Sequence, residues 1–290
     1  MEELIIDYKI PLGKWMAFII DLLNEHAYFI FDFFTLFLDS IIIGTTSGLL
    51  FLPSLLLISL FTVFTWFIHR NIGLTLFSFL SLLLILNLGY WQETVETLVL
   101  VGYSTLICML VGVPLGILAA HNPRFYAVLR PILDLMQTIP TFVYLIPTLI
   151  LFGLGVVPGL ISTVIFAIAA PVRLTCLGIS SVPLNLREAG VSFGCGKTRL
   201  LYEIELPYAL PTIMAGLTQC IMLSLSMVVI AALVGADGLG KPVVRALNTV
   251  NIVNGFEAGL CIVIIAILLD RVCKQPEKKS FFKGRNGIQH

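Results

Sequence analysis

The chain has 290 residues, of which 58% are hydrophobic and only 12% are charged, and its formal net charge is +0. Soluble domains carry about 25% charged residues, and a single soluble core of this length could not bury so much apolar surface. The composition therefore excludes an ordinary soluble domain, gives no basis for nucleic-acid binding, and indicates that lipid is the solvent for most of the chain. Six cysteines are scattered without CxxC pairing, so we expect neither a disulfide nor a metal site.

The first 40 residues are acidic. They hold seven acidic residues against Lys9 and Lys14, and they lack the positively charged start of a cleavable signal peptide. Within residues 13–38 the apolar runs are interrupted by charged side chains, which favours an amphipathic helix in the membrane plane over an eighth span. We therefore expect residues 1–40 to form an extracytoplasmic segment with an interfacial helix.

Seven later stretches are apolar and long enough to cross a hydrocarbon core, which takes about 20 residues. They are residues 41–68, 72–90, 97–120, 132–154, 157–181, 208–235 and 254–270. The first is expected to be tilted or broken near Pro53. The fourth and fifth contain Pro140, Pro147 and Pro171, and irregular backbone survives at membrane depth only where protein or water covers it. We therefore expect this pair inside the bundle, near a pathway.

Lys and Arg predict the orientation, because short loops rich in these residues stay in the cytoplasm. The segments concerned are the loop with Arg124 and Arg130, the loop with Arg187, Lys197 and Arg199, the His69–Arg70 turn, and the basic tail 272–290. Glu93, Glu96 and the loop 236–253 then fall outside, together with the N-terminus. The transmembrane domain is expected to span residues 41–271, with the C-terminus in the cytoplasm.

The longest polar interval is the loop 183–207, between the fifth and sixth spans. Its first residues suit a helix start, and small or apolar residues recur at helical spacing up to Phe193. Gly194 and Gly196 should end this helix, and a second short helix should follow and stop at Pro207. We predict two short helices lying across a membrane face, with small residues that permit close approach by a partner.

This loop resembles the EAA loop of bacterial ABC-importer permeases, whose pattern is Glu-Ala-Ala, three residues, Gly, nine residues and then Ile-x-Leu-Pro. The residues that match in register are Glu188, Ala189, Gly194, Ile204, Leu206 and Pro207, while Gly190 stands where the pattern has its second Ala. The resemblance implies a coupling helix that docks on a cytoplasmic ATPase and turns closure of the ATPase dimer into a swing of the membrane helices. We expect Gly190 to add flexibility without abolishing docking.

The run Gly194-Cys-Gly-Lys-Thr198 looks like the end of a phosphate-binding P-loop. The full motif needs glycine at position 191, which is Val191, and no strand is expected before it. We therefore expect no cofactor in this chain and no enzymatic activity of its own. ATP and Mg should be bound by the partner ATPase.

Further segments resemble the permeases of glycine betaine/proline betaine importers, whose relatives move carnitine and choline. They are residues 134–144, 155–159, 213–216, 225–231, 238–240 and 255–259. The resemblance implies an all-α polytopic protein with a MetI-like fold at the bacterial cytoplasmic membrane, and a role in osmoprotection. It also implies a homodimer of permease copies, two ATPase subunits and an extracytoplasmic substrate-binding protein.

The residues themselves give weaker evidence about the identity of the transported solute. Gln137, Pro140, Phe142 and Tyr144 could line a kinked pathway, although aromatic side chains in spans usually pack and Gln137 could instead bond a neighbouring helix. Glu257, near the outer end of the last span, is either functional or hydrated at the interface. A permease for another small solute such as an amino acid, and an ATP-independent osmotic channel or carrier, remain open.

Overall fold

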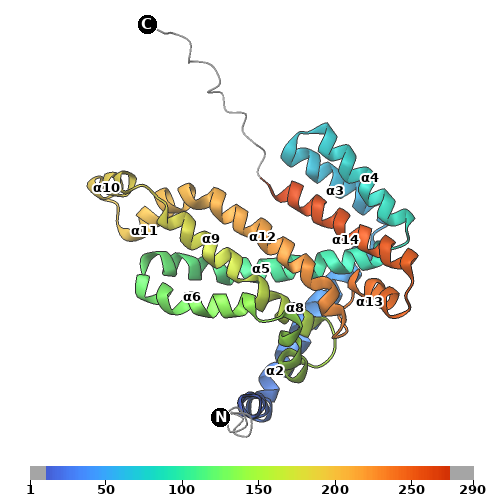
Figure 1. Ribbon diagram of the computed structural model, residues 1–290. Helices are drawn as coiled ribbons and strands as arrows, with labels where there is room; N and C mark the ends of the chain where they lie inside the picture. Colours follow the sequence, from blue (N-terminus) through green and yellow to red (C-terminus); the bar gives the residue numbers. More distant parts are fainter. Residues whose placement is uncertain (1–10, 275–290) are drawn as a thin grey trace, which may run out of the picture.

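The computed structural model describes residues 11–274, which fold into helices joined by short turns, with no strand among them (Figure 1). The helices are α2 (Leu12–Phe51), α3 (Ser54–His69), α4 (Ile72–Asn87), α5 (Trp91–His121), α6 (Pro123–Thr138), η1 (Thr141–Tyr144), α7 (Leu145–Phe152), α8 (Val156–Ala167), α9 (Ala169–Ser180), α10 (Leu184–Ser192), α11 (Lys197–Leu200), η2 (Leu201–Glu205), α12 (Leu206–Ala232), α13 (Gly240–Asn248) and α14 (Ile252–Cys273). The first ten residues of the acidic segment, and the basic tail from residue 275, lie outside the described residues.

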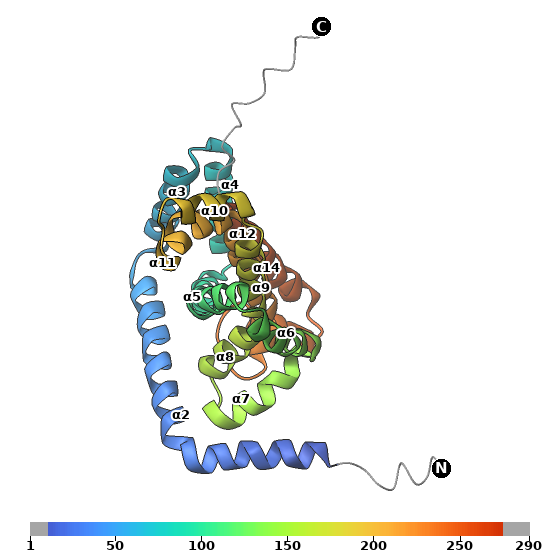
Figure 2. The same cartoon turned by 90° about the vertical axis from the view of Figure 1, so that its left-hand side faces the viewer.

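The N-terminal helix α2 corrects the expected start of the first span. It continues through residue 40 to Phe51, and the stretch 41–68 is two helices because the chain becomes extended at Leu52, before Pro53. Proline disfavours the helical conformation of the residue before it, which accounts for the break. Figure 2 shows α2 along one flank of the bundle, with its first part turned at a steep angle to the rest. The interfacial role of that first part stays a prediction.

Among residues 11–274, five helices are long and apolar enough to cross a membrane, or six if the bent pair formed by α6 with residues 141–152 is one span. The pair is bent by 104° at Pro140, as the prolines of the fourth span led us to expect. The expected span 72–90 is α4, which has 16 residues, like α3. At 1.5 Å per residue each is about 24 Å long, shorter than the ~30 Å hydrocarbon core. The two pack as a hairpin at the side of α14 (Figure 1).

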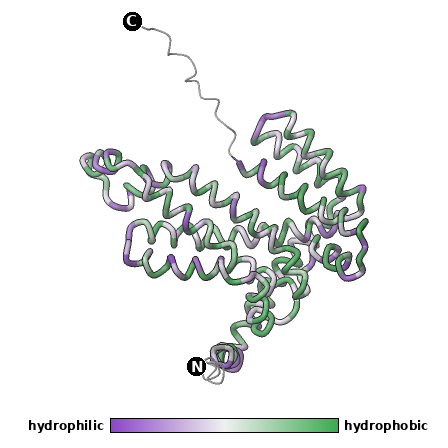
Figure 3. The backbone as a smooth tube through the Cα atoms, in the orientation of Figure 1, coloured by the Kyte–Doolittle hydropathy of each residue, from purple (hydrophilic) through white to green (hydrophobic). Residues whose placement is uncertain are grey.

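The centre of the bundle is formed by α5, α8, α9 and α12, which pack on one another. Close packing of α5 on α9 depends on Gly116, where an added Cβ would lie 2.7 Å from the backbone oxygen of Val172. Small residues at helix crossings let membrane helices approach closely, because packing rather than water exclusion holds them together. Figure 3 shows the result, a bundle whose helices are mostly hydrophobic and whose hydrophilic residues gather at turns and at a few places along α6 and α9.

Two ends of the bundle can be distinguished by contacts. At the loop end, which carries residues 183–207, His121 lies beside Glu205, and the end of α14 lies beside the start of α12. At the opposite end, which carries α13, the backbone N–H of Leu239 donates to Thr97 of α5 at 2.8 Å. The basic loops between α5 and α6 and between α9 and α12 therefore share one end, as the orientation argument requires.

Candidate functional site

The loop 183–207 begins with a short helix, α10, that ends as its sequence predicts. Gly194 has a φ of +78°, its N–H donates to the Val191 carbonyl, and the N–H of Cys195 donates to the Gly190 carbonyl. These two bonds form a Schellman motif, in which a left-handed glycine satisfies the last carbonyls of a helix. The first half of the predicted loop structure is thus present, and Gly194 holds its turn.

Gly190 lies where α10 meets the second half of the loop. An added Cβ at Gly190 would lie 2.5 Å from the Cδ1 atom of Ile204 and 2.9 Å from that of Leu200. Gly190 is itself buried, so its missing side chain allows α10 to rest on these two apolar side chains. Gly190 therefore permits close packing of α10 on the second half of the loop. The flexibility expected from the sequence stays a prediction.

The second half of the loop differs from the prediction of a separate helix ending at Pro207. From Lys197 the helix continues through a π-helical turn at Leu201–Glu205 directly into α12, and Pro207 lies in the first turn of α12. Proline has no N–H for the carbonyl four residues earlier, and its ring crowds that carbonyl. A wider π turn before it lets the helix continue. Leu206 and Pro207 therefore join the loop rigidly to a membrane helix.

A buried ionic cluster fastens this junction, and it was not singled out from the sequence. The carboxylate of Glu205 is only 2% exposed; its Oε2 atom lies 2.8 Å from Nε2 of His121, and its Oε1 atom lies 3.2 Å from Nε of Arg187. Arg187 also donates to the backbone carbonyl of Ile179, at the end of α9. The other ring nitrogen of His121 faces the Ile117 carbonyl at 2.9 Å, so both ring nitrogens lie beside oxygen atoms.

The cluster joins three segments: the end of α5, the helix α10, and the π-helical turn before α12. The sequence feature that could have indicated the cluster is the position of one histidine and one glutamate, each next to the end of an expected span. Their pairing across 84 residues needed the structure.

The outer surface of the loop carries exposed apolar side chains. Phe193, at the tip, is 90% exposed, and Leu184 and Val191 are exposed as well. Glu188 and Ala189 are exposed beside them. Exposed apolar groups with adjacent polar ones mark sites where another protein binds.

The predicted pathway residues do not form one constellation. Gln137 and Pro140 lie at the bend after α6, and Phe142 and Tyr144 are in η1, which packs on α7 and α8. Glu257 is in the first turns of α14, near the α13 end, and α14 packs mainly on α12 and α13.

The aromatic side chains near the bend make packing and backbone contacts. The Tyr144 hydroxyl donates to the Met136 carbonyl at 2.7 Å, which pins η1 to the end of α6. Phe152 packs edge-on against Phe31 of α2, with ring centroids 5.3 Å apart. Neither contact forms a cage for a quaternary ammonium group.

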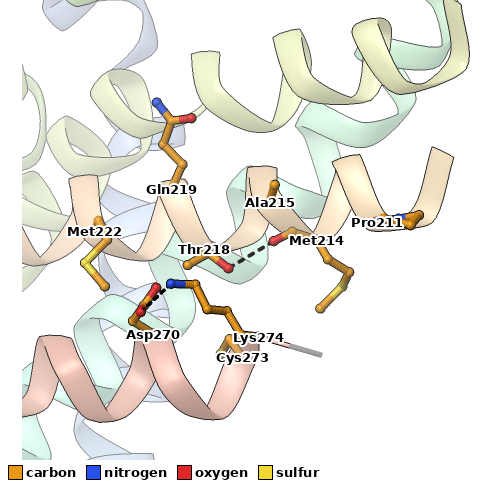
Figure 4. Close-up of a pocket in the computed structure, with 9 residues that line it drawn as sticks. All are labelled: Pro211, Met214, Ala215, Thr218, Gln219, Met222, Asp270, Cys273 and Lys274. Carbon is orange, nitrogen blue, oxygen red and sulfur yellow. Dashed lines mark hydrogen bonds and ion pairs between the residues drawn. The ribbon is translucent and has the colours of Figure 1, made fainter. Parts of the chain in front are cut away.

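A groove of about 450 Å³ lies between α12 and α14 near the loop end (Figure 4). Within it, Lys274 pairs with Asp270 at 2.7 Å, and Thr218 donates to the Met214 carbonyl at 3.1 Å, as the dashed lines in Figure 4 indicate. Its nine lining residues include no aromatic side chain. The groove therefore lacks the features that recognise a quaternary amine.

Together, the fold and the loop define a polytopic helical membrane protein that presents a short, rigidly joined helix at one end of its bundle. Residues 112–272 match the family described as "Binding-protein-dependent transport system inner membrane component", and the chain belongs to this family. It is the membrane-embedded permease component of such a system.

Relatives resemble the chain along nearly its whole length. It is 43% identical to the glycine betaine transport system permease protein OpuAB of Bacillus subtilis, over 95% of this chain and 98% of that protein. It is 41% identical to the glycine betaine/proline betaine transport system permease protein ProW of Escherichia coli, over 95% of this chain and 77% of that protein. An inward-facing structure of the MetNI methionine ABC transporter matches 63% of this chain and 92% of its own, with a TM-score of 0.59 at 20% identity. This likeness confirms the predicted MetI-like fold.

Proposed function

We propose that this chain is the permease subunit of an ATP-driven importer that carries glycine betaine or a related quaternary-amine osmoprotectant, such as carnitine, choline or proline betaine, across the bacterial cytoplasmic membrane. The observation that carries the proposal is the similarity along 95% of the chain to permeases whose names specify glycine betaine and proline betaine. A solute without net charge also suits spans in which charged side chains are few.

The loop 183–207 is proposed to dock on a separate ATPase subunit, which binds ATP and Mg. Its exposed tip at Phe193 offers the contact surface, and its continuity with α12 offers the mechanical connection. A rigid lever joined to membrane helices is what converts a partner's closure into a change of the bundle. In this proposal the docking face includes Glu188, Ala189 and Gly194. The connection to α12 includes Ile204, Leu206 and Pro207.

The loop end is proposed to face the cytoplasm, and the α13 end to face outward. Basic residues of the described chain gather at the loop end, including Arg124, Arg187 and Arg199. Positive residues in short loops are retained on the cytoplasmic side. The N-terminus is then outside and the C-terminus inside.

A second copy of this chain and an extracytoplasmic binding protein are proposed to complete the transporter. The bundle of one chain leaves the polar side of α6 and the bend at Pro140 uncovered, and a homodimer would enclose a pathway between two such surfaces. Selection of the solute is assigned to the binding protein, because no aromatic cage stands out in the described part of this chain.

The test is transport by the purified assembly. The chain is co-purified with its ATPase, placed in liposomes with its binding protein, and supplied with radiolabelled glycine betaine. We expect uptake that requires ATP and the binding protein. Uptake that persists without ATP, or a permease to which no ATPase binds, would identify a channel or carrier instead. Uptake of an amino acid with none of betaine, carnitine, choline or proline betaine would overturn the solute assignment.

A further inference from the structure

A polar stripe on α6 runs beside the contact of this helix with α9. Beside the stripe, Leu133, which is 3% exposed, packs against Ala169 and Val172 of α9, while the opposite side of α6 carries apolar residues such as Ile132. Asp134 and Arg130 are exposed one helical turn apart, and Gln137 follows Asp134 by one further turn. The helix is therefore amphipathic within a membrane domain, and its polar side needs an aqueous or protein environment.

Asp134 pairs with a cation on the neighbouring helix. The Nη2 atom of Arg173, in α9, donates to Oδ1 of Asp134 at 2.7 Å, and the two side chains are 36% and 53% exposed. Within residues 11–274, this is the one ion pair that joins two membrane helices away from their ends. Figure 3 shows hydrophilic stretches partway along α6 and α9, in agreement with this position.

The position of the pair along two membrane helices argues against a lipid-facing site. Asp134 is eleven residues from Pro123 at the loop end, about 16 Å along α6, and Arg173 is seven residues from Ser180, about 10 Å along α9. Both charges thus lie within helices that are apolar enough to belong to candidate membrane spans, and well away from the ends of those spans. Charged groups within membrane spans face a water-filled cavity or the interior of the bundle, and they mark the path of the transported species. The half-exposed side of the pair is therefore a pathway surface.

We propose that Asp134 and Arg173 form a transient site for a zwitterionic solute in the translocation pathway. The carboxylate of the solute pairs with the guanidinium of Arg173, and the quaternary ammonium group of the solute lies against the carboxylate of Asp134. The inference rests on the proposed function, and it assigns to this chain a site for the carboxylate-bearing class of quaternary amines.

The exchange of partners explains why such a site holds its solute loosely. When the solute enters, the internal ion pair opens and each protein charge is paired with the opposite charge of the solute, so neither is left unpaired. A pathway site must bind well enough to admit the solute and weakly enough to release it. A pair that re-forms when the solute leaves meets both conditions, and it also leaves no unpaired charge in the empty pathway.

The test measures weak binding directly, without the binding protein. The permease–ATPase complex is embedded in nanodiscs, and saturation-transfer NMR follows the trimethylammonium signal of glycine betaine or of choline, a cation without a carboxylate. In the wild-type complex we expect betaine to bind. Arg173→Gln should lower the ratio of betaine to choline signal by about tenfold, as expected for the loss of a charge-assisted hydrogen bond. Asp134→Asn should weaken the binding of both betaine and choline.

The matched control is Arg124→Gln, which removes an exposed arginine from the first turn of the same helix and should leave both signals unchanged. If the pair is only a strut between α6 and α9, both variants lower the melting temperature while the ratio of betaine to choline stays constant, and the proposal is overturned. Absence of betaine binding to the wild-type complex also overturns it. Failure of the proposed function is a separate result, because it appears as lack of betaine uptake by the wild-type transporter in liposomes.

Discussion

The carboxylate of Glu205 lies 2.8 Å from the imidazole of His121, although 84 residues separate them in the sequence. Glu205 is in the π-helical turn before α12, and His121 is the last residue of α5. Arg187, in α10, reaches the same carboxylate at 3.2 Å. A movement of α10 imposed by a docked partner is thereby shared with two membrane helices at once. The cluster gives the loop a physical route into the bundle beyond chain connectivity.

Replacement of Glu205 by Gln should weaken coupling. Removing one member of a buried ion pair leaves the others without a partner, which costs about 3–5 kcal/mol for fully buried groups. Arg187 and His121 are part exposed, so water will satisfy them in part and a loss of about 1–2 kcal/mol is expected. Transport per ATP hydrolysed, measured in liposomes, should fall several-fold, and the melting temperature of the complex should fall slightly.

The control for Glu205 is two residues away. Glu203→Gln removes a carboxylate that is 59% exposed and pairs with Arg199, four residues earlier in the same helix. Exposed pairs of this kind contribute little, so coupling should be unchanged. Equal loss of coupling in both variants would assign the effect to loop charge in general and remove the special role of the buried cluster.

Gly190 should tolerate one added carbon but not a branched side chain. The atoms that a Cβ would meet are the ends of the Ile204 and Leu200 side chains, which can rotate away. Gly190→Ala should therefore keep ATPase binding, in line with the alanine of the usual EAA pattern. Gly190→Ile should displace α10 from Ile204 and Leu200 and destabilise the loop by about 1–3 kcal/mol. Affinity for the ATPase, measured by titration against the nanodisc-embedded permease, checks both variants. Equal affinity for Gly190→Ile and the wild-type protein would contradict the packing role.

Local patterns in the sequence predicted the parts of this structure that depend on near neighbours. The break at Pro53, the bend at Pro140 and the glycine turn at Gly194 follow from the backbone preferences of these residues and their neighbours. The helix that continues through Pro207 was missed, because a π turn depends on how the helix is held at both ends.

Long-range pairs were beyond the reach of a single sequence. Arg173 and Asp134 lie 39 residues apart, and nothing in their spacing indicates that α6 and α9 pack side by side with these groups in register. The exposure of Phe193 likewise depends on how the loop is held against the bundle. Spans and caps follow from composition and local chemistry, whereas ion pairs between helices follow from the packed bundle.

The tip of the loop should be needed for ATPase docking and not for folding. Phe193 is 90% exposed, so Phe193→Asp removes apolar contact area and adds a charge at the proposed interface without disturbing the core. The variant should bind the ATPase at least tenfold more weakly, as expected for an aromatic anchor, with an unchanged melting temperature of the isolated permease. Leu247→Asp, at the α13 end, is the control, because Leu247 is also exposed but lies on the opposite end. Normal ATPase affinity for Phe193→Asp would argue against docking through this tip.

The contact between α5 and α9 at Gly116 should be the least tolerant glycine position in α5. An added Cβ there would lie 2.6 Å from the Cβ of Thr175 and 2.7 Å from the backbone oxygen of Val172. Backbone atoms cannot rotate away, so Gly116→Ala must push the two helices apart and should destabilise the bundle by about 1–3 kcal/mol. Gly102→Ala, in the same helix, meets no atom within 4 Å and should be neutral or slightly stabilising. Thermal unfolding of the two variants in detergent compares them directly. Similar melting temperatures would mean that α5 and α9 can separate at little cost, and that their close contact does not limit the stability of the bundle.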